Sequence, residues 1–382
     1  MYNHQNHYES DKVQAQIFRF QGESEVTEHH VMLHVTDPTL PFADQLYAIQ
    51  HSLQELSSQL GVVYPVFMRC FISDASNQEQ MVRDIFSDSP CALSVVQQPP
   101  LNGTKIALWA WMMTNVKTQV SDSGLYAVSH GNFRHLFSAG NTIGAKDSET
   151  QTRLIMERYC MQLGVEGLSL EANCIRTWFF VNDIDNNYHG IVKARNDVFS
   201  GQGLTAKTHY ITSTGIGGRQ ADPKTSSVMD AYAIDGIQKS QIHYLYAASH
   251  LNRTSDYGVA FERGCYVDYA DRRHAFISGT ASIDNKGQVL YKGDIVRQTH
   301  RMLENIGALL QEADMTIEDH VAQMIVYLRD ISDYAVVKSI FDQRCPGKPV
   351  VFVHAPVCRP SWLIETECMA VKEMKNPSLP SF

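Results

Sequence analysis

The chain has 382 residues, of which 44% are apolar and 19% are charged, and its formal net charge is -9. This is the composition of an ordinary globular protein, and the length allows two or three domains or one large composite core. The negative charge argues against a nucleic acid or an anionic membrane as partner, because both favour a basic surface, although a local arginine cluster can still bind a small anionic substrate.

The sequence also sets the expected environment. It has no run of about 20 apolar residues that could cross a membrane, and its first residues form no apolar leader. The eight cysteines are scattered without a C-x-x-C pair, which favours buried, reduced thiols and no metal site. We therefore expect a cytoplasmic protein without metal or organic cofactor. Its expected partner is a small anionic substrate, and self-association is left open.

The predicted elements fall into three successive groups after a tail at residues 1–15. The first group occupies residues 16–118. In it, a helical pattern starts at Asp44, a strand follows at 66–74, and a short helix follows at 81–86. Its apolar positions follow the same order as in the later groups but the similarity is fainter, so we interpret this group as a degenerate unit.

The second group occupies residues 119–240 and the third occupies residues 241–382. In the third group, apolar residues at helical spacing predict a helix through 303–310. A buried strand is predicted at 324–328, then an Asp-containing turn, a second helix at 334–341 and closing strands. The candidate functional residues lie mainly in this last group.

The second and third groups repeat each other. The text from Gln151 aligns without a gap with the text from Gln298, and R-H-L-F-S-A-G at 134–140 is echoed by R-H-A-F-I-S-G at 273–279. Each copy predicts a β-β-α-β-α-β unit, an α+β layer with helices on one face of a sheet. Three bare sheet faces can cover one another, so we predict three such units around a pseudo-threefold axis.

The last strand carries two glutamates. Residues 363–368 read L-I-E-T-E-C, and a period of two places Glu365 and Glu367 on one face. Taken alone, such a pair indicates a solvated face more often than an active site. An acid needed only for the fold should recur in every copy, but the second copy offers only Asp230 and the first offers no acid at 107–112. This difference favours a special role in the third copy.

Three segments resemble the YjgF/RidA family over the last third of the chain. They are S-G-T-A-S-I from Ser278, V-Y-L-R-D-I from Val326 and I-E-T-E-C-M-A from Ile364. Members are typically homotrimers of one such unit with clefts between subunits, so the resemblance implies a fused trimer. The best-known activity of the family, hydrolysis of reactive imines and enamines, depends on an arginine that binds the substrate carboxylate. Counted back from Glu365, Val350 stands at that position, which argues against this activity.

The chain is more similar to the chorismatase branch of this fold. The similar segments are S-G-T-A-S-I from Ser278, T-G-I-G-G from Thr214, R-T-W and G-I-V-K-A-R-N between residues 176 and 196, Y-G-V-A-F-E-R from Tyr257, and C-R-P-S-W-L-I-E-T-E from Cys358. They are spread over the second and third groups, so the resemblance implies a site built from both.

The chorismatase resemblance implies roles for particular residues. The first glutamate of the closing strand is the catalytic acid of that branch, which assigns this role to Glu365. Arginines bind the two carboxylates of chorismate, and Arg263 and Arg359 match positions of that kind. One arginine of the branch is absent from its expected place, and Arg253 is close enough to substitute for it. The other predicted substrate contacts are Ser278, Gly279 and Thr280 of the S-G-T text, and Cys358 beside the ring.

The chemistry asks for an acid and cations. Chorismate is a dianion with an enol ether, and release of pyruvate requires a proton on the enolpyruvyl methylene carbon. A carboxylic acid supplies that proton near pH 7 only if burial raises its pKa. The apolar neighbours of Glu365, among them Trp362 and Ile364, predict such burial. Arginine suits carboxylates through its planar fork, and a glycine at position 279 allows close approach to backbone N–H groups.

The sequence thus predicts a chorismatase-like hydrolase or lyase that releases pyruvate and either a dihydroxycyclohexadiene carboxylate or a hydroxybenzoate. Two alternatives remain open: an enamine or imine deaminase that uses Arg359 in place of the missing arginine, and a non-catalytic small-molecule-binding protein. The chorismatase prediction requires Glu365, Arg263, Arg359 and Gly279 to converge on one cleft. A solvent-facing Glu365 would favour the binding protein.

Overall fold

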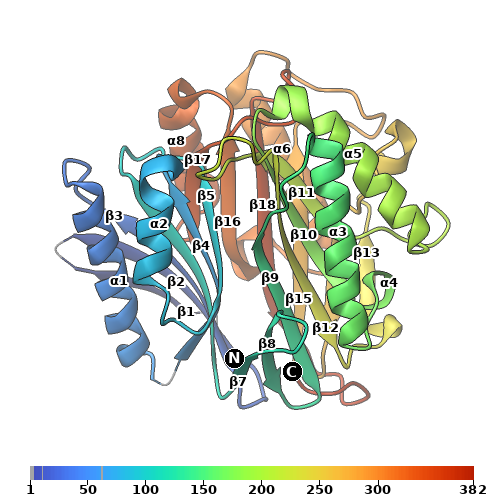
Figure 1. Ribbon diagram of the computed structural model, residues 1–382, viewed down its shortest axis with the longest axis horizontal. Coiled ribbons are helices and arrows are strands. Elements are labelled where there is room, and N and C mark those ends of the chain that lie inside the picture. Colours follow the sequence, from blue (N-terminus) through green and yellow to red (C-terminus); the bar gives the residue numbers. More distant parts are fainter. Residues whose placement is uncertain (1–3, 11, 62) are drawn as a thin grey trace.

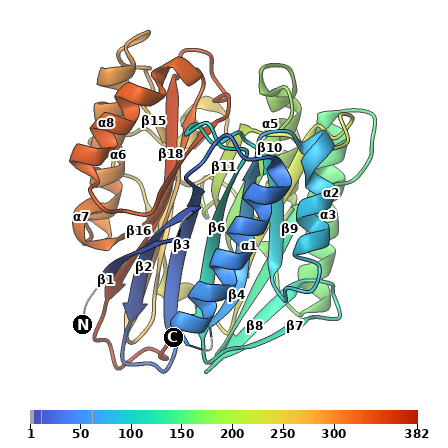
Figure 2. The same cartoon turned by 90° about the vertical axis from the view of Figure 1, so that its left-hand side faces the viewer.

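The computed structural model describes residues 4–10, 12–61 and 63–382. They form three mixed six-stranded sheets whose outer faces carry the helices and whose inner faces meet (Figures 1 and 2). The strand orders are β1-β2-β3-β6-β4-β5, β7-β8-β9-β12-β10-β11 and β13-β14-β15-β18-β16-β17. This confirms the predicted α+β fold of three YjgF-like units around a pseudo-threefold axis. Each unit has two strands more than predicted.

The first unit begins inside the predicted tail. β1 pairs antiparallel with β2 over six residues, so the prediction of a tail at 1–15 is wrong for the residues described there. At the other edge of the sheet, β4 and β5 pair in parallel. The elements are β1 (His4–Glu9), β2 (Val13–Gln21), β3 (Thr27–Val35), α1 (Phe42–Gln59), β4 (Val63–Ile72), α2 (Ala75–Ile85), β5 (Ala92–Gln97) and β6 (Ile106–Thr114).

The second unit repeats this order with two long helices. Asp147 caps the first of them, because its carboxylate accepts a hydrogen bond from the Thr150 N–H at 2.8 Å. The elements are β7 (Lys117–Val120), β8 (Tyr126–His130), β9 (Phe133–Asn141), α3 (Ser148–Val165), α4 (Leu170–Asn173), β10 (Cys174–Val181), α5 (Ile184–Gly201), β11 (Thr212–Gly217) and β12 (Ser227–Asp235).

The third unit has the same order and closes the molecule. Its first long helix is capped in the same way, by Asp294 on the Arg297 N–H at 3.0 Å. The elements are η1 (Lys239–Gln241), β13 (Ile242–Leu245), η2 (Thr254–Tyr257), β14 (Gly264–Asp268), β15 (Arg272–Ala281), α6 (Ile295–Glu312), α7 (Ile317–His320), β16 (Val321–Leu328), η3 (Ile331–Asp333), α8 (Tyr334–Arg344), β17 (Val350–His354) and β18 (Ile364–Glu373).

A glutamine in the first turns of α1, α3 and α6 recurs for a structural reason. Gln151 and Gln298 each donate to a backbone carbonyl just before the closing strands β12 and β18. Gln45 accepts from the backbone N–H just before β6. The side chain thus fixes the helix to the start of the last strand in every unit, which explains the gap-free alignment of the sequence.

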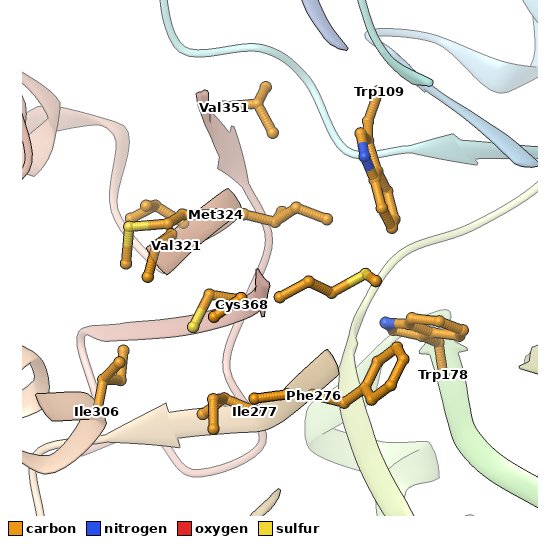
Figure 3. Close-up of a cluster of buried hydrophobic side chains, with 14 of the residues drawn as sticks. Trp109, Trp178, Phe276, Ile277, Ile306, Val321, Met324, Val351 and Cys368 are labelled. Carbon is orange, nitrogen blue, oxygen red and sulfur yellow. The ribbon is translucent and has the colours of Figure 1, made fainter. Parts of the chain in front are cut away.

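The three inner faces share one core on the axis. Trp109 of the first unit, Trp178 of the second and Phe276 of the third belong to the same buried cluster (Figure 3). The ring of Phe67 lies 5.3 Å from that of Trp109 and 6.0 Å from that of Trp178. Separation of the units would expose these large rings to water, at a cost of about 25 cal/mol per Å² of apolar area.

Candidate active site

The closing strand β18 turns both glutamates of the E-T-E text into the protein. Glu365 is 5% exposed and Glu367 is 1% exposed, which excludes the solvated face. The strand register places Val228 and Ala107 at the position of Glu365 in the other two units. Asp230 corresponds to Glu367 and not to Glu365. The third unit alone therefore has an acid at this place.

A β-bulge in β15 makes room for the Glu365 carboxyl group. The pairing of β15 with β18 shifts between Ile277 and Thr280. A Cβ atom on Gly279 would overlap Glu365 Oε1 and would lie 3.1 Å from Thr214 Cγ2. The close approach of the carboxyl group therefore requires a glycine. The Gly279 N–H donates to Thr214 Oγ1 at 2.9 Å, so this N–H is not directed at a substrate, contrary to the prediction.

Glu365 ends a chamber between the second and third units. The second unit contributes side chains from α5 and β11, and the third contributes β15, β18 and the segments that precede β14 and β18. The chamber encloses about 40 Å³, which holds about two or three water molecules. It shares Tyr188, Val259, Cys358 and Arg359 with a vestibule of about 650 Å³ beside α5.

Three guanidinium groups line the chamber. Arg263 is 4% exposed and donates to the backbone and side-chain oxygens of Asn252 at 3.1 to 3.2 Å. Arg195 of α5 is 1% exposed. Arg359 is half-buried, and its guanidinium lies 4.8 Å from the centre of the Trp362 ring. Buried guanidinium groups at the wall of a chamber suit a ligand that carries carboxylates.

Arg195 was not among the predicted contacts. It lies in the G-I-V-K-A-R-N text that carries the chorismatase resemblance, but nothing in that text separates it from a solvated helix cation. The packing of α5 against the third unit turns it inward, where its guanidinium lies 5.6 Å from the ring of Phe261. Tyr188 and Trp362 were also missed as lining residues, and both lie within segments of the same resemblance.

The environment of Glu365 favours its neutral form. Burial raises the pKa of Glu365 to about 8, and the negative charge of Glu367 adds to this effect, whereas Arg263 and Arg176 oppose it. A carboxyl group with this pKa is mostly protonated at pH 7. It meets the requirement for a general acid that works near neutral pH.

Glu367 belongs to an ionic network on the axis. Its Oε2 accepts from Arg176 Nη2 at 2.7 Å, and its Oε1 accepts from Trp178 Nε1 at 2.8 Å. Arg69 of the first unit lies 3.5 Å from Glu367 Oε1 and 2.9 Å from the carboxylate of Asp230. The network therefore joins all three units directly behind the chamber.

Cys358 lies in the wall of both the chamber and the vestibule, where the resemblance placed a residue beside the substrate ring. Burial raises the pKa of the Cys358 thiol to about 12, and the charge of Glu365 acts in the same direction. A thiol with this pKa stays protonated at neutral pH, so it contributes shape and not a nucleophile.

Three predicted contacts do not line the chamber. Ser278 Oγ donates to the Glu262 carbonyl at 2.6 Å and accepts from the Ser213 N–H at 3.0 Å. Thr280 Oγ1 donates to the Ser278 carbonyl at 2.9 Å. The Ser278 hydroxyl thus joins β15 to two neighbouring segments, and the Thr280 hydroxyl bonds within the bulge of β15. Arg253 is 43% exposed and lies 3.7 Å from Glu262, so it does not replace the arginine that is absent from its expected place.

The position of the parent family's arginine lies in a different cleft. Val350 begins β17 and lines the cleft between the third and first units, together with Gln16, His34 and Phe352. The strand registers place Ser213 at the equivalent position of the second unit, and Ser213 lines the chamber, so the chamber also lacks an arginine at this position.

The part of the chain that the structure describes contains no group of three His, Cys, Asp or Glu side chains placed to hold a metal ion. In the same ranges, no helix is both long enough and apolar enough to cross a membrane. The eight cysteines are free thiols.

Comparison with known proteins agrees with the repeat. The family model described as endoribonuclease L-PSP matches residues 260–372. RutC family proteins of Pyrococcus abyssi and Pyrococcus horikoshii are 36% and 37% identical to this chain over 100 residues, which is 26% of this chain and 78% and 79% of the relatives. The chain therefore belongs to the YjgF/RidA family, to which these RutC proteins also belong.

A solved structure extends the likeness to the other units. The crystal structure of a chorismatase matches with a TM-score of 0.63 at 16% identity, and the match covers 80% of this chain and 93% of that chain. At this identity the match establishes the fold. The arrangement of several units in one chain is therefore shared with a known protein and extends well beyond the third unit.

Proposed function

We propose that this chain is a chorismatase-type hydrolase whose active site is the chamber between the second and third units. One observation carries the proposal: the Glu365 carboxyl is buried, has a pKa of about 8 and ends a chamber lined by arginines. The fold shared with a chorismatase supports the choice of substrate.

The two carboxylates of chorismate would bind to different arginines. Arg263 and Arg195 are buried at the inner wall and bind the carboxylate of the enolpyruvyl group. Arg359 borders the vestibule and accepts the ring carboxylate. Because the chamber encloses only about 40 Å³, the ring stays in the vestibule beside Cys358, and the enol ether reaches Glu365.

Glu365 would then act as the general acid. It transfers its proton to the methylene carbon of the enol ether, which leaves an oxocarbenium ion. Water adds to this ion, the resulting hemiketal collapses, and the carbon–oxygen bond breaks to release pyruvate and a dihydroxycyclohexadiene carboxylate. The Glu365 carboxylate takes up the proton that the water releases, so the enzyme returns to its first state. Capture of the ion by the ring hydroxyl leads to a hydroxybenzoate instead.

The test is to incubate the purified protein with chorismate beside a Glu365→Gln variant. Pyruvate and the aromatic or diene product are followed by chromatography. We expect turnover by the wild type and a loss of about 10³-fold or more in the variant, because a positioned general acid contributes about 10² to 10⁴. Glu373→Gln, on the exposed end of the same strand, is the control and keeps full activity. A wild type without turnover contradicts the proposal.

A deaminase of the parent type is the second candidate, favoured by the family membership and by Arg359 in the chamber wall. It predicts hydrolysis of a 2-aminoacrylate-type imine that depends on Arg359 and not on protonated Glu365. If neither substrate is turned over but chorismate still binds, the chain is a binding protein.

A further inference from the structure

The proposed reaction leaves one buried charge unexplained. Glu367 follows Glu365 by two residues on the same face of β18 and is 1% exposed. The equivalent residues of the other units are Trp109 and Asp230, so the fold does not demand a glutamate here. A buried carboxylate is costly unless it is paired, and its retention beside a second carboxyl group calls for a reason.

We propose that Glu367 is a positioning residue: its negative charge keeps the proton on Glu365, and Arg176 and Arg69 hold that charge in place. This inference rests on the proposed function only where it concerns catalysis. The protonation of Glu365 can be measured without turnover.

Arg176 connects Glu367 to the bulge that surrounds the acid. Arg176 Nη2 lies 2.7 Å from Glu367 Oε2 and 2.5 Å from Thr214 Oγ1. Thr214 Oγ1 also accepts the Gly279 N–H at 2.9 Å. The same guanidinium group therefore fixes the negative charge and, through one hydroxyl, the glycine on which the Glu365 carboxyl rests.

Arg69 brings the first unit into the site. Its side chain is fully buried and is shared between Asp230 at 2.9 Å and Glu367 at 3.5 Å. Its guanidinium also lies 4.8 Å from the ring of Trp178, which stands beside Trp109 on the axis (Figure 3). Because Arg69 is divided between two carboxylates, it anchors Glu367 and offsets only part of its charge. The degenerate first unit thus acts on a chamber whose lining comes from the second and third units.

Among the charged groups around Glu365, Glu367 is the one that opposes the ionisation of Glu365. The charged and titratable groups that face Glu365 or line the chamber with it are Glu367, Arg176, Arg195, Arg263, Arg359, Tyr188, Tyr327 and Cys358. Tyr327 and Cys358 are neutral at pH 7, because burial raises the pKa of both. The arginines favour an ionised Glu365, whereas burial and Glu367 oppose ionisation. Without Glu367, the balance moves toward the carboxylate.

The first experiment compares the wild type with Glu367→Gln in two measurements. The carbonyl stretch of the protonated Glu365 is recorded against pH by infrared difference spectroscopy, with Glu365→Gln as the blank. The pH dependence of kcat/KM for chorismate is recorded in parallel. We expect the titration of the band and the alkaline fall of activity to move down together by at least one pH unit. At pH 8 activity then falls at least about fivefold, and at pH 6 it stays within about twofold.

For the second variant, Arg69→Met, we expect a shift of both curves in the opposite direction. It removes a cation from Glu367, so both curves move to higher pH, and Arg69→Lys restores the wild-type position in part. If Arg69→Met does not fold, Arg69→Lys alone still reports the direction. A purely structural role predicts equal loss of activity at every pH and an unmoved infrared titration, and that result overturns the proposal. A moved band without chorismate turnover instead contradicts the proposed function and leaves this inference standing.

Discussion

The chamber between the second and third units and the cleft between the third and first units occupy equivalent places around the pseudo-threefold axis. The cleft is larger, about 550 Å³ against about 40 Å³. However, the strand registers put Ala107 in the first unit where the third has Glu365, and Gln16 where the third has Arg263. There, β3 pairs with β6 without a bulge. The larger volume therefore does not make this cleft the better candidate, because it has no acid, arginine or bulge at the places where the chamber has them.

The second unit shows that the bulge alone is not enough. Gly140 corresponds to Gly279, and its N–H donates to Asp230 Oδ1 at 2.7 Å. The space beside Gly140 is occupied by Arg83 and Gln220, whose side-chain nitrogens lie 3.6 and 3.9 Å from the place of a Cβ atom. The Asp230 carboxylate thus accepts from this backbone N–H, whereas Glu365 lies over a glycine whose N–H donates to Thr214.

The substitution Arg263→Gln gives the chamber the residue that the cleft between the third and first units has at this place. Among the substitutions that follow, we expect it to have the largest effect. Loss of one partner of a buried charged contact costs about 2 to 5 kcal/mol, so kcat/KM for chorismate should fall about 10²- to 10³-fold. Steady-state kinetics measure the fall, and most of it should appear in KM if Arg263 binds the substrate before the reaction.

Arg253→Gln is the matched control for Arg263→Gln. Arg253 lies in the same segment but is 43% exposed, so the variant should stay within about twofold of the wild type. Equal losses in both variants would show that the loop, and not the buried guanidinium, matters for activity.

The substitution Gly279→Ala tests the bulge. Its Cβ atom would displace the Glu365 carboxyl, and a misplacement of about 1 Å costs about 10²-fold in rate. Kinetics at pH 7 measure this loss. The control is Gly140→Ala in the second unit, where φ is +63° and the nearest atom lies at 3.6 Å. It should lower the free energy of unfolding by about 1 kcal/mol and keep the activity. A fully active Gly279→Ala variant would contradict the tight seat of the carboxyl group.

Much of the fold was predictable because residues that recur between the units have the same structural role in each of them. Gln151 and Gln298 align since each ties a helix to the closing strand. The pattern of Glu365 and Glu367 predicted one shared face, and the regular pairing of β18 with β16 through these residues confirms it. The convergence of Glu365 with Arg263 could be predicted only from the resemblance, because the two residues lie about a hundred positions apart.

The errors in the predicted site come from partners that are distant in the sequence. The sequence comparison found Asp230 as the single acid of the second copy but could not assign it to one of the two glutamates, because the bulges shift the strand pairing. Ser278 sits in a segment typical of substrate contacts, but Glu262 and Ser213 take its hydroxyl. Arg195 shows the reverse case, a helix cation that only the neighbouring unit makes part of the chamber.

A second comparison lies between the two ends of the sheets. At one end of the sheets, burial raises the pKa of a carboxyl group, and at the other it acts on histidines. His130 Nε2 and His135 Nε2 lie 2.7 Å apart, and His135 Nδ1 lies 2.7 Å from the hydroxyl of Tyr232. Burial lowers the pKa of His130 to about 4, with the positive charge of Arg272 as the next cause. In both places the neutral form is favoured, because a charge is poorly solvated inside the protein.

These histidines predict a loss of stability in mild acid. His130 has a lower pKa when folded than its ordinary value of about 6.5, so its contribution is full above that pH and is lost as the pH falls toward 4. Between pH 7.5 and pH 5 this difference amounts to about 2 kcal/mol of unfolding free energy. Denaturant unfolding should therefore show a shallower acid decline for His130→Gln than for the wild type. His51→Gln is the control, because the His51 side chain is 70% exposed and its replacement should leave the slope unchanged. If the stability of His130→Gln and that of the wild type decline in parallel, the protonation of carboxylates and not of His130 causes the acid sensitivity. The effect of burial on protonation is then restricted to Glu365.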